Sequence, residues 1–408
     1  MSSPRTSELK SKARKSRRLR DELQGYYLHN KVEYVRQGKP FFKLLKSLID
    51  QAKESIHLQT YIFEDDETGR FIGDALGTAA QRGVAVYVLV DGYASKIAKE
   101  FLADIRGKGV KFRLFSPFFK SRHFYFGRRL HHKIVVIDGE EAMVGSMNIA
   151  DKYNDVGDEK AWLDRALHIK GEVASELQRI CIRFWEGKKW RIIRKPKAAA
   201  RSEKKFPDSY QTPVRVRQND WINRKGQATR TYYQIFHNAQ KYICVVCSYV
   251  LPDSVLRAQL EKAAKRGVHI SFILAGTSDV RVVKTAERYL YRWMIRNKMK
   301  LYEYQPAVLH VKMAVADDEI LTLGSYNLNN LSAYASVELN VDIKDSDFVK
   351  LVHDDITEVI RKECIVVPLE DYMTRLFSWR QFMRWGAYVV TRIGEKIITK
   401  KGKGINAH

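Results

Sequence analysis

The chain has 408 residues, 45% of them hydrophobic and 11% aromatic, which is enough for two globular domains with a core each. Its 72 Lys and Arg residues outnumber its 47 Asp and Glu residues, for a formal net charge of +25. This excess favours an anionic partner, either nucleic acid or anionic lipid headgroups. The sequence excludes a membrane-spanning helix, which needs about 20 apolar residues, and its four cysteines form no disulfide framework.

The first predicted segment, residues 1–25, is a basic arm. Its first 20 residues, "MSSPRTSELKSKARKSRRLR", contain eight Lys or Arg with no apolar core behind them. A secretory signal needs such a core, so that interpretation is excluded. The composition instead predicts a disordered arm that carries positive charge.

Residues 26–186 and 217–365 are predicted to be two copies of one fold, joined by a basic linker at 187–216. The stretch "AAQRGVAVYVLVDG" (79–92) aligns with "AAKRGVHISFILAG" (263–276), so that a helix ending in Arg-Gly precedes an apolar strand in each copy. Strand, helix and strand in this order predict an α/β fold. We expect two tandem repeats, each a mostly parallel sheet flanked by helices, packed with pseudo-twofold symmetry.

One composite motif occurs in both copies. "HHKIVVIDGEEAMVGSMN" (131–148) and "HVKMAVADDEILTLGSYN" (310–327) both spell H-x-K-x4-D-x6-G-S-x-N without a gap. His131 therefore recurs as His310, whereas the adjacent His132 aligns with Val311 and is expected to be a space-filling neighbour. The predicted catalytic residues are His131, Lys133, Asp138, His310, Lys312 and Asp317, and the predicted phosphate-binding residues are Ser146, Asn148, Ser325 and Asn327.

The motif has the chemistry of a phosphate site. Positions two apart in a strand share a face, so each histidine projects together with the lysine of its motif. Two such half-sites would clamp a phosphate between two imidazoles, one attacking phosphorus to form a phosphohistidine and the other protonating the leaving oxygen. The lysines supply the positive charge, so neither a metal nor another cofactor is expected. A single His-x-Lys or a single Gly-Ser-x-Asn would more often be structural than catalytic. Two gapless copies of the composite motif favour catalysis.

The paired H-x-K-x4-D motifs resemble those of the phospholipase D superfamily, over roughly residues 40–345. "IHLQTYIFEDDETG" (56–69) and "RALHIKGEVASELQRICIRFWE" (165–186) further resemble bacterial cardiolipin synthases of the short type without transmembrane helices. The resemblance implies that a phosphatidyl group passes from a phospholipid to the enzyme, with His131 as nucleophile, and then to an alcohol on phosphatidylglycerol. Many such synthases have Gly-Gly where this chain has Gly145-Ser146, which leaves the acceptor open.

The repeat also aligns two acidic residues, Asp164 in the first copy and Glu338 in the second. The resemblance implies that an acidic residue at this place orients the catalytic imidazole by accepting its second ring proton. An acidic residue at a sheet edge is the structural alternative.

The two copies differ most just ahead of the first motif. The first copy has an additional aromatic and basic segment there, "FFKSRHFYFGRRL" (118–130). It is expected either to meet lipid headgroups at the mouth of the site or to be an ordinary packed loop.

The C-terminal segment, residues 366–408, is predicted to be a basic amphipathic tail. Apolar side chains recur in it at helical spacings of three and four among arginines and lysines, with Trp near the edges. Such a helix suits the membrane–water interface, although packing on the protein's own core is the usual alternative. The expected membrane contacts are Trp379, Arg380, Met383, Arg384 and Trp385.

These features together predict a phosphatidyltransferase at the cytoplasmic side of the cell membrane, held peripherally, with anionic phospholipid as partner and phospholipids as substrates. A phospholipase D-type hydrolase or nuclease would use the same site with water as acceptor. A basic membrane or nucleic-acid binding protein with vestigial sites is the third interpretation, and intact motifs in both copies argue against it. Nucleic acid is the less favoured partner.

Overall fold

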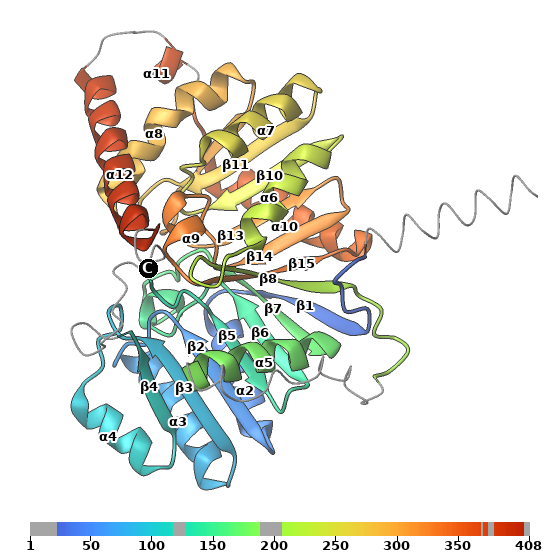
Figure 1. Cartoon of the computed structure of the whole chain (residues 1–408), viewed down its shortest axis with the longest axis vertical. Coiled ribbons are helices and arrows are strands. Elements are labelled where there is room, and N and C mark those ends of the chain that lie inside the picture. The colour runs from blue at the N-terminus through green and yellow to red at the C-terminus, as the bar shows by residue number, and fades with distance from the viewer. Residues whose placement is uncertain (1–22, 117–127, 188–205, 369, 374–378, 404–408) are drawn as a thin grey trace, which may run out of the picture.

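The computed structural model describes residues 23–116, 128–187, 206–368, 370–373 and 379–403. They form two α/β halves stacked along the longest axis, the first below the second in Figure 1. Most of the predicted basic arm, the middle of the linker and nearly all of the insertion at 118–130 lie outside the described residues.

The first half is built around a seven-stranded sheet of order β1-β7-β6-β5-β2-β3-β4. Its elements are β1 (Asn30–Arg36), α2 (Lys39–Gln51), β2 (Ser55–Thr60), α3 (Glu67–Gln81), β3 (Ala85–Asp91), α4 (Lys99–Gly107), β4 (Lys111–Phe115), β5 (Ile134–Ile137), β6 (Glu141–Gly145), the 3₁₀ helix η1 (Asp151–Tyr153), β7 (Arg165–Gly171) and α5 (Glu172–Glu186).

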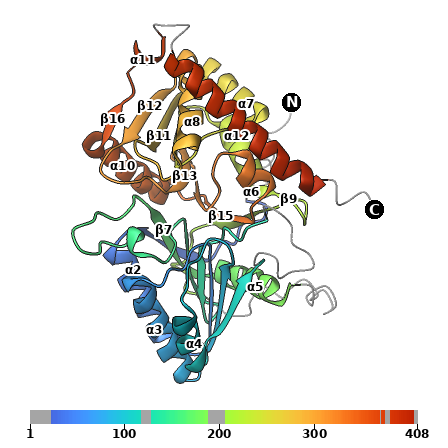
Figure 2. The same ribbon diagram turned by 90° about the vertical axis from the view of Figure 1, so that its left-hand side faces the viewer.

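The second half is built around a nine-stranded sheet of order β16-β12-β11-β10-β13-β14-β15-β8-β9. Its elements are β8 (Val214–Asp220), β9 (Lys225–Gly226), α6 (Gln227–Asn238), β10 (Tyr242–Cys247), α7 (Ser254–Lys265), β11 (His269–Ala275), α8 (Arg281–Arg296), β12 (Lys300–Tyr304), β13 (Lys312–Ala316), β14 (Ile320–Gly324), α9 (Asn330–Tyr334), β15 (Glu338–Ile343), α10 (Ser346–Glu363), β16 (Cys364–Val366), α11 (Glu370–Met373) and α12 (Trp379–Lys403). Figure 2 shows α12 lying across α8 on the outside of this half.

The predicted α/β repeats are confirmed, because the succession of strands and helices from β1 to α5 recurs from β8 to α10, with β9 added and α9 in the place of η1. The expected parallel pairing holds for β2-β3-β4 and β10-β11-β12 and needs correction elsewhere, since the other strand pairs are antiparallel. Crossover helices separate the parallel strands, whereas tight turns join β5 to β6 and β13 to β14, and a tight turn permits only antiparallel pairing.

Three apolar clusters stabilise this arrangement. One lies in each half between the sheet and its helices, α2 to α4 in the first half and α6 to α8 in the second. The third is shared by the halves and includes Val136 and Leu177 from the first with Leu323 and Val352 from the second. Because the halves cannot separate without exposing this cluster, the two repeats are held at a defined position relative to each other.

The aspartate of the first motif, Asp138, makes the turn between β5 and β6. Asp138 and Gly139 both have positive φ, 53° and 67°, as a two-residue hairpin turn requires. The Asp138 carboxylate also accepts the backbone N–H groups of residues 53–55, at 2.8–2.9 Å, and so fixes the start of β2.

The aspartate of the second motif, Asp317, does the same for residues 240–242 at the start of β10, at 2.7–2.9 Å. Both aspartates lie at the end of their strand, β5 or β13, that is remote from the motif histidine. The prediction that Asp138 and Asp317 are catalytic is therefore corrected. Their place in the motif reflects a turn that begins five residues after the lysine, where the strand ends.

Replacing Asp138 by Ala should lower the free energy of unfolding by about 1–3 kcal/mol, because three backbone donors lose a charged acceptor. Asp138→Asn should lose less, since Asn retains one acceptor oxygen and tolerates positive φ. Chemical unfolding of the three proteins measures this effect. A loss of activity in Asp138→Ala with an unchanged free energy of unfolding would show that Asp138 is catalytic after all.

Candidate active site

A cavity of about 440 Å³ lies where the two halves meet. Both motif histidines line it, together with polar and aromatic side chains from each half. Its lining includes Tyr61, His131, Asn148, Tyr153, Trp162, Val283, His310, Asn327, Leu331 and Glu338.

The two histidines are held by carboxylates of the opposite half. His131 Nδ1 lies 2.8 Å from Glu338 Oε2, and His310 Nδ1 lies 2.7 Å from Asp164 Oδ2. Both carboxylates are fully buried. With Nδ1 engaged, each imidazole has Nε2 left to face the cavity, which is the arrangement that a nucleophile or proton donor needs.

The backbone crosses between the halves at the same points. The His131 N–H donates to the carbonyl of Val337 at 2.9 Å, and the His310 N–H donates to the carbonyl of Leu163 at 2.8 Å. Each of these carbonyls belongs to the residue just before the carboxylate that holds the same histidine. Two backbone bonds and two side-chain bonds therefore align the strand ends of one half with those of the other.

The motif serines support the carboxylates. Ser325 Oγ donates to Glu338 at 2.5 Å, and Ser146 Oγ donates to Asp164. Both serines are fully buried. The prediction that they bind phosphate is corrected, because their hydroxyl protons are directed to the carboxylates that orient the histidines.

The motif asparagines do line the cavity, as expected of phosphate-binding residues. Asn148 accepts from the Ile62 N–H at 3.1 Å and from the Thr60 hydroxyl at 3.4 Å, and it donates to the Tyr153 hydroxyl at 2.7 Å. Asn327 is buried at the equivalent position of the second half. Their phosphate-binding role stays a prediction.

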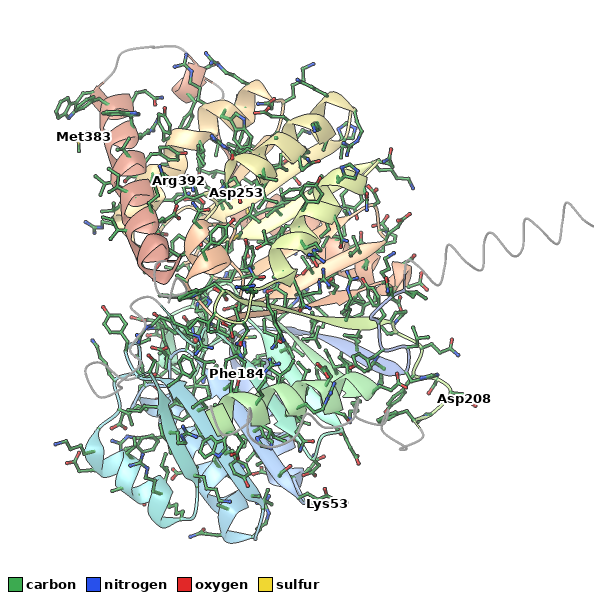
Figure 3. All side chains as sticks on the ribbon, viewed as in Figure 1. Lys53, Phe184, Asp208, Asp253, Met383 and Arg392 are labelled. Carbon is green, nitrogen blue, oxygen red and sulfur yellow. The ribbon has the colours of Figure 1, made fainter. Side chains whose placement is uncertain are left out.

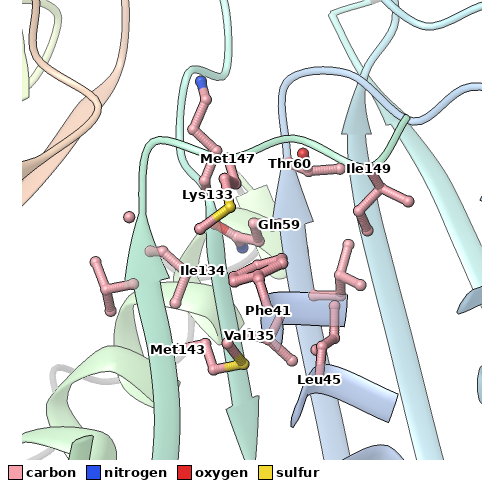
Figure 4. A pocket seen from close by; sticks show the side chains of 13 residues that line it. Phe41, Leu45, Gln59, Thr60, Lys133, Ile134, Val135, Met143, Met147 and Ile149 are labelled. Atoms are coloured by element: carbon pink, nitrogen blue, oxygen red, sulfur yellow. The ribbon is translucent and has the colours of Figure 1, made fainter. Parts of the chain in front are cut away.

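Both motif lysines are buried beside the histidines. Each ammonium donates to the backbone carbonyl of the histidine two residues before it, Lys133 to His131 at 3.0 Å and Lys312 to His310. Figure 4 shows the Lys133 side chain pointing away from Phe41 and the other apolar side chains that fill the interior of the first half. The lysines thus carry positive charge into an otherwise desolvated site.

Burial and like charge oppose protonation of these groups. Burial lowers the pKa of both lysines, and the nearby Lys312 ammonium lowers the pKa of Lys133 further. Burial also lowers the pKa of both histidines, with Glu338 or Asp164 acting against it and the lysine of the same motif adding to it. At pH 7 the free imidazoles are therefore neutral, the form in which a histidine is nucleophilic.

His132 lies outside the cavity, as its lack of a counterpart predicted. It is fully buried, with Nδ1 3.0 Å from Gln59 Oε1 and its ring edge 4.9 Å from the centroid of Phe184, which Figure 3 labels inside the first half. Burial holds its pKa well below the usual value. It is a neutral core residue.

Aromatic rings around the histidines were not predicted. Tyr61 lies edge-on to His131 at 5.0 Å between ring centroids, and Tyr153 and Trp162 lie 5.1 and 5.9 Å from His310. Tyr61 has Ser248 as its counterpart in the second copy, so the repeat gives no signal for the first ring. Tyr153 and Trp162 align with serines, so comparison of the halves offers no signal for them.

The fold with its paired histidine–lysine half-sites defines a phospholipase D-like protein. A family model described as "Cardiolipin synthase, PLD-like domain" matches residues 45–185 and 232–360. The chain belongs to this cardiolipin synthase family. Cardiolipin synthase B of Escherichia coli (strain K12) is 31% identical to it over 344 residues, which are 82% of this chain and 81% of that protein.

Other proteins agree with this assignment. Cardiolipin synthase of Halalkalibacterium halodurans is 30% identical over 317 residues, 76% of this chain and 62% of that protein. The crystal structure of phosphatidylserine synthase from Haemophilus influenzae Rd KW20 superposes with a TM-score of 0.71 and 16% identity, covering 94% of this chain and 99% of that one. Polyphosphate kinase from Porphyromonas gingivalis gives 0.57 at 16% identity, over 90% and 53% of the chains. At such identities the structures show a shared fold alone.

The crossed pairs predict how the pKa of His131 responds to substitution. Glu338→Gln removes a negative charge beside the ring and should lower the pKa of His131, whereas Lys133→Met removes a positive charge and should raise it. Asp164→Asn serves as the control, because that carboxylate bonds to His310. NMR titration of histidine-labelled protein, assigned with a His131 variant, measures the change. A change in the pKa of His131 in Asp164→Asn, with no change in Glu338→Gln, would contradict the pairing of each histidine with a carboxylate of the opposite half.

Proposed function

We propose that the chain is a phosphatidyltransferase of the cardiolipin synthase type, with phosphatidylglycerol as donor and as acceptor. The observation that carries this proposal is the pair of crossed histidine–carboxylate hydrogen bonds, which aim two imidazoles into one cavity beside two buried ammonium groups. The curated relatives named cardiolipin synthase, matched over most of the chain, support the choice of reaction.

The first step is attack on the donor lipid. Neutral His131 Nε2 forms a bond to phosphorus while the bond from phosphorus to the leaving glycerol oxygen breaks. His310, protonated once the phosphodiester anion is bound, donates its proton to that oxygen. Glu338 stabilises the positive charge that develops on His131, and Asp164 stabilises the protonated form of His310.

The second step reverses these roles. His310, now neutral, takes the proton from a hydroxyl of the acceptor lipid, whose oxygen attacks the phosphohistidine and restores His131. Lys133, Lys312 and the two motif asparagines stabilise the charge on the non-bridging oxygens in both steps. The assignment of His131 as the nucleophile rests on the family resemblance, since the site is nearly symmetric.

The proposal includes a peripheral position at the cytoplasmic side of the membrane, and α12 supports it. No helix within the described ranges is long and apolar enough to cross a bilayer. One stripe of α12 is nevertheless apolar and exposed. It consists of Trp379, Phe382, Met383, Val390, Ile393 and Ile397, each at least half exposed. Figure 3 shows Met383 projecting outward from the molecule.

The opposite stripe of α12 packs on the second half. Arg392 donates to the carbonyl of Pro252 at 2.6 Å, and the buried Glu395 accepts from Asn330 of α9 at 3.0 Å. Arg384 lies over the ring of Tyr372 at 4.4 Å. Its prediction as a membrane contact is therefore corrected, because the side chain is directed toward the protein. Each alternative for this helix therefore describes one of its faces. The inner face packs on the core, and the exposed face is the one proposed to lie in the membrane interface.

The reaction is tested with vesicles of phosphatidylglycerol, followed by mass spectrometry of the lipid products. Cardiolipin and glycerol are expected. Replacing either His131 or His310 by Ala should reduce transfer by at least about 10³-fold, because nucleophilic attack and proton transfer are separate duties. His132→Ala should retain most of the activity per folded molecule. Phosphatidic acid as the only product would identify water as the acceptor and the chain as a hydrolase.

Chelation should leave the reaction unchanged, because the lysines supply the positive charge at the phosphate. Transfer by EDTA-treated protein is best measured on short-chain phosphatidylglycerol below its micelle concentration, so that effects of cations on vesicle binding do not enter. Full activity is expected. Loss of turnover that is restored by Mg²⁺ or Zn²⁺ would contradict the phosphohistidine scheme.

A further inference from the structure

A second large cavity lies away from the catalytic site. It is a groove of about 560 Å³ between α7, α8 and α12, and its main lining residues are Arg257, Arg292, Trp293, Arg296, Phe382 and Trp385. The first turn of α8 reaches the catalytic cavity through Val283, whereas Arg292 and Arg296 belong to its last two turns. At 1.5 Å per residue, nine to thirteen residues separate the two sites by roughly 14–20 Å.

The groove carries three arginines whose charge is not neutralised within the described part of the chain. None of Arg257, Arg292 and Arg296 forms an ion pair with a described carboxylate, and the Nε atoms of Arg257 and Arg292 are buried without a hydrogen-bond partner there. The neighbouring carboxylate, Glu261, accepts the Trp293 indole N–H at 2.6 Å. Buried guanidinium donors without an acceptor are unfavourable, and an anion in the groove would satisfy them.

The rim of the groove is aromatic and exposed. Trp379, Phe382 and Trp385 follow one another along α12, with ring centroids 5.6 and 5.8 Å apart, and Trp379 is 74% exposed. Aromatic side chains beside basic ones are typical of surfaces that lie at the level of lipid headgroups. A soluble phosphate would use the arginines and leave this apolar rim in water.

We propose that this groove binds the phosphate of an anionic phospholipid in the bilayer surface, as a headgroup site distinct from the catalytic one. The guanidinium groups provide the forked donors that match phosphate oxygens, and the aromatic rim enters the interface beside the lipid. The inference rests on the proposed function in one respect, namely that the chain acts on lipids at a membrane.

Lipid binding at this groove sets the orientation of the catalytic cavity relative to the bilayer. From the groove, the exposed apolar stripe of α12 continues through Val390 and Ile393 to Ile397. At that end α12 bonds through Glu395 to Asn330 of α9, and the next residue of α9, Leu331, lines the catalytic cavity. Figure 1 shows α12 running from the outer end of the second half to the junction of the halves, so a bilayer held at the groove and along this stripe comes close to the catalytic cavity at that junction.

The test compares a triple variant, R257Q/R292Q/R296Q, with a matched control, K43Q/K53Q/K99Q, which removes the same charge from exposed positions in the first half. Binding is measured by flotation with phosphatidylcholine vesicles that contain 0 or 30% phosphatidylglycerol. The groove variant should bind the anionic vesicles at least about tenfold more weakly than wild type, and the control less than about threefold. Turnover of short-chain, water-soluble phosphatidylglycerol should be unchanged in both.

A lysine variant, R257K/R292K/R296K, separates a built site from general attraction. It retains the positive charge but loses the paired donors of the guanidinium groups. Its affinity for anionic vesicles should therefore lie between those of wild type and the glutamine variant. Binding equal to wild type, or equal loss in the groove variant and the control, would overturn the proposal. Equal loss of turnover on soluble and vesicle lipid would overturn it as well, because the arginines would then act on the fold or the catalytic cavity.

The failure of the proposed function is recognised separately. Wild-type protein that binds anionic vesicles through the groove without transferring phosphatidyl groups would sustain the headgroup site and refute the reaction. Inorganic phosphate provides the remaining comparison, at constant ionic strength. Tight binding of phosphate to the groove, with no preference for anionic vesicles, would overturn the assignment to lipid.

Discussion

The crossed hydrogen bonds between each motif histidine and a carboxylate of the opposite half are the interaction on which the site depends. His131 is held by Glu338 and His310 by Asp164, so neither half contains a complete pair. The backbone crosses at the same places, and the apolar cluster shared by the halves stabilises their contact. The cavity and its chemistry therefore exist only in the assembled pair of repeats, which explains why both copies have kept the whole motif.

The electrostatics of the site follow from this assembly. Docking the halves brings two ammonium groups, Lys133 and Lys312, into a desolvated region where like charges repel and where burial already lowers their pKa. Two carboxylates of the site are engaged by histidines and serines, so they offset this charge only in part. In the proposed reaction, a bound phosphodiester anion would relieve the repulsion, and the same charge would favour the protonated form of the histidine that acts as the acid.

In the proposed function, the helix α12 places this site at a membrane surface. Its inner stripe belongs to the folded second half through Arg392 and Glu395, while its outer stripe presents apolar side chains to the surroundings. A helix docked in this way would fix the orientation of the protein on a membrane, which a disordered tail would not do. The arginine groove at one end and the catalytic cavity near the other are consequently related by a fixed distance and direction, so one bilayer surface can serve both.

The sequence by itself determined the α/β repeats, the paired histidines and lysines, and the amphipathic tail, because these follow from local periodicity and from self-similarity along the chain. Only the tertiary structure decided what each polar motif residue contacts. Asp138 lies at a remote turn and Ser146 supports a carboxylate, since spacing gives the strand position of a residue but not its partner across the halves. The aromatic wall at His310 and the arginine groove were hidden for a related reason. Both are built from residues that the two repeats do not share or that lie outside them, and packing alone brings those residues together.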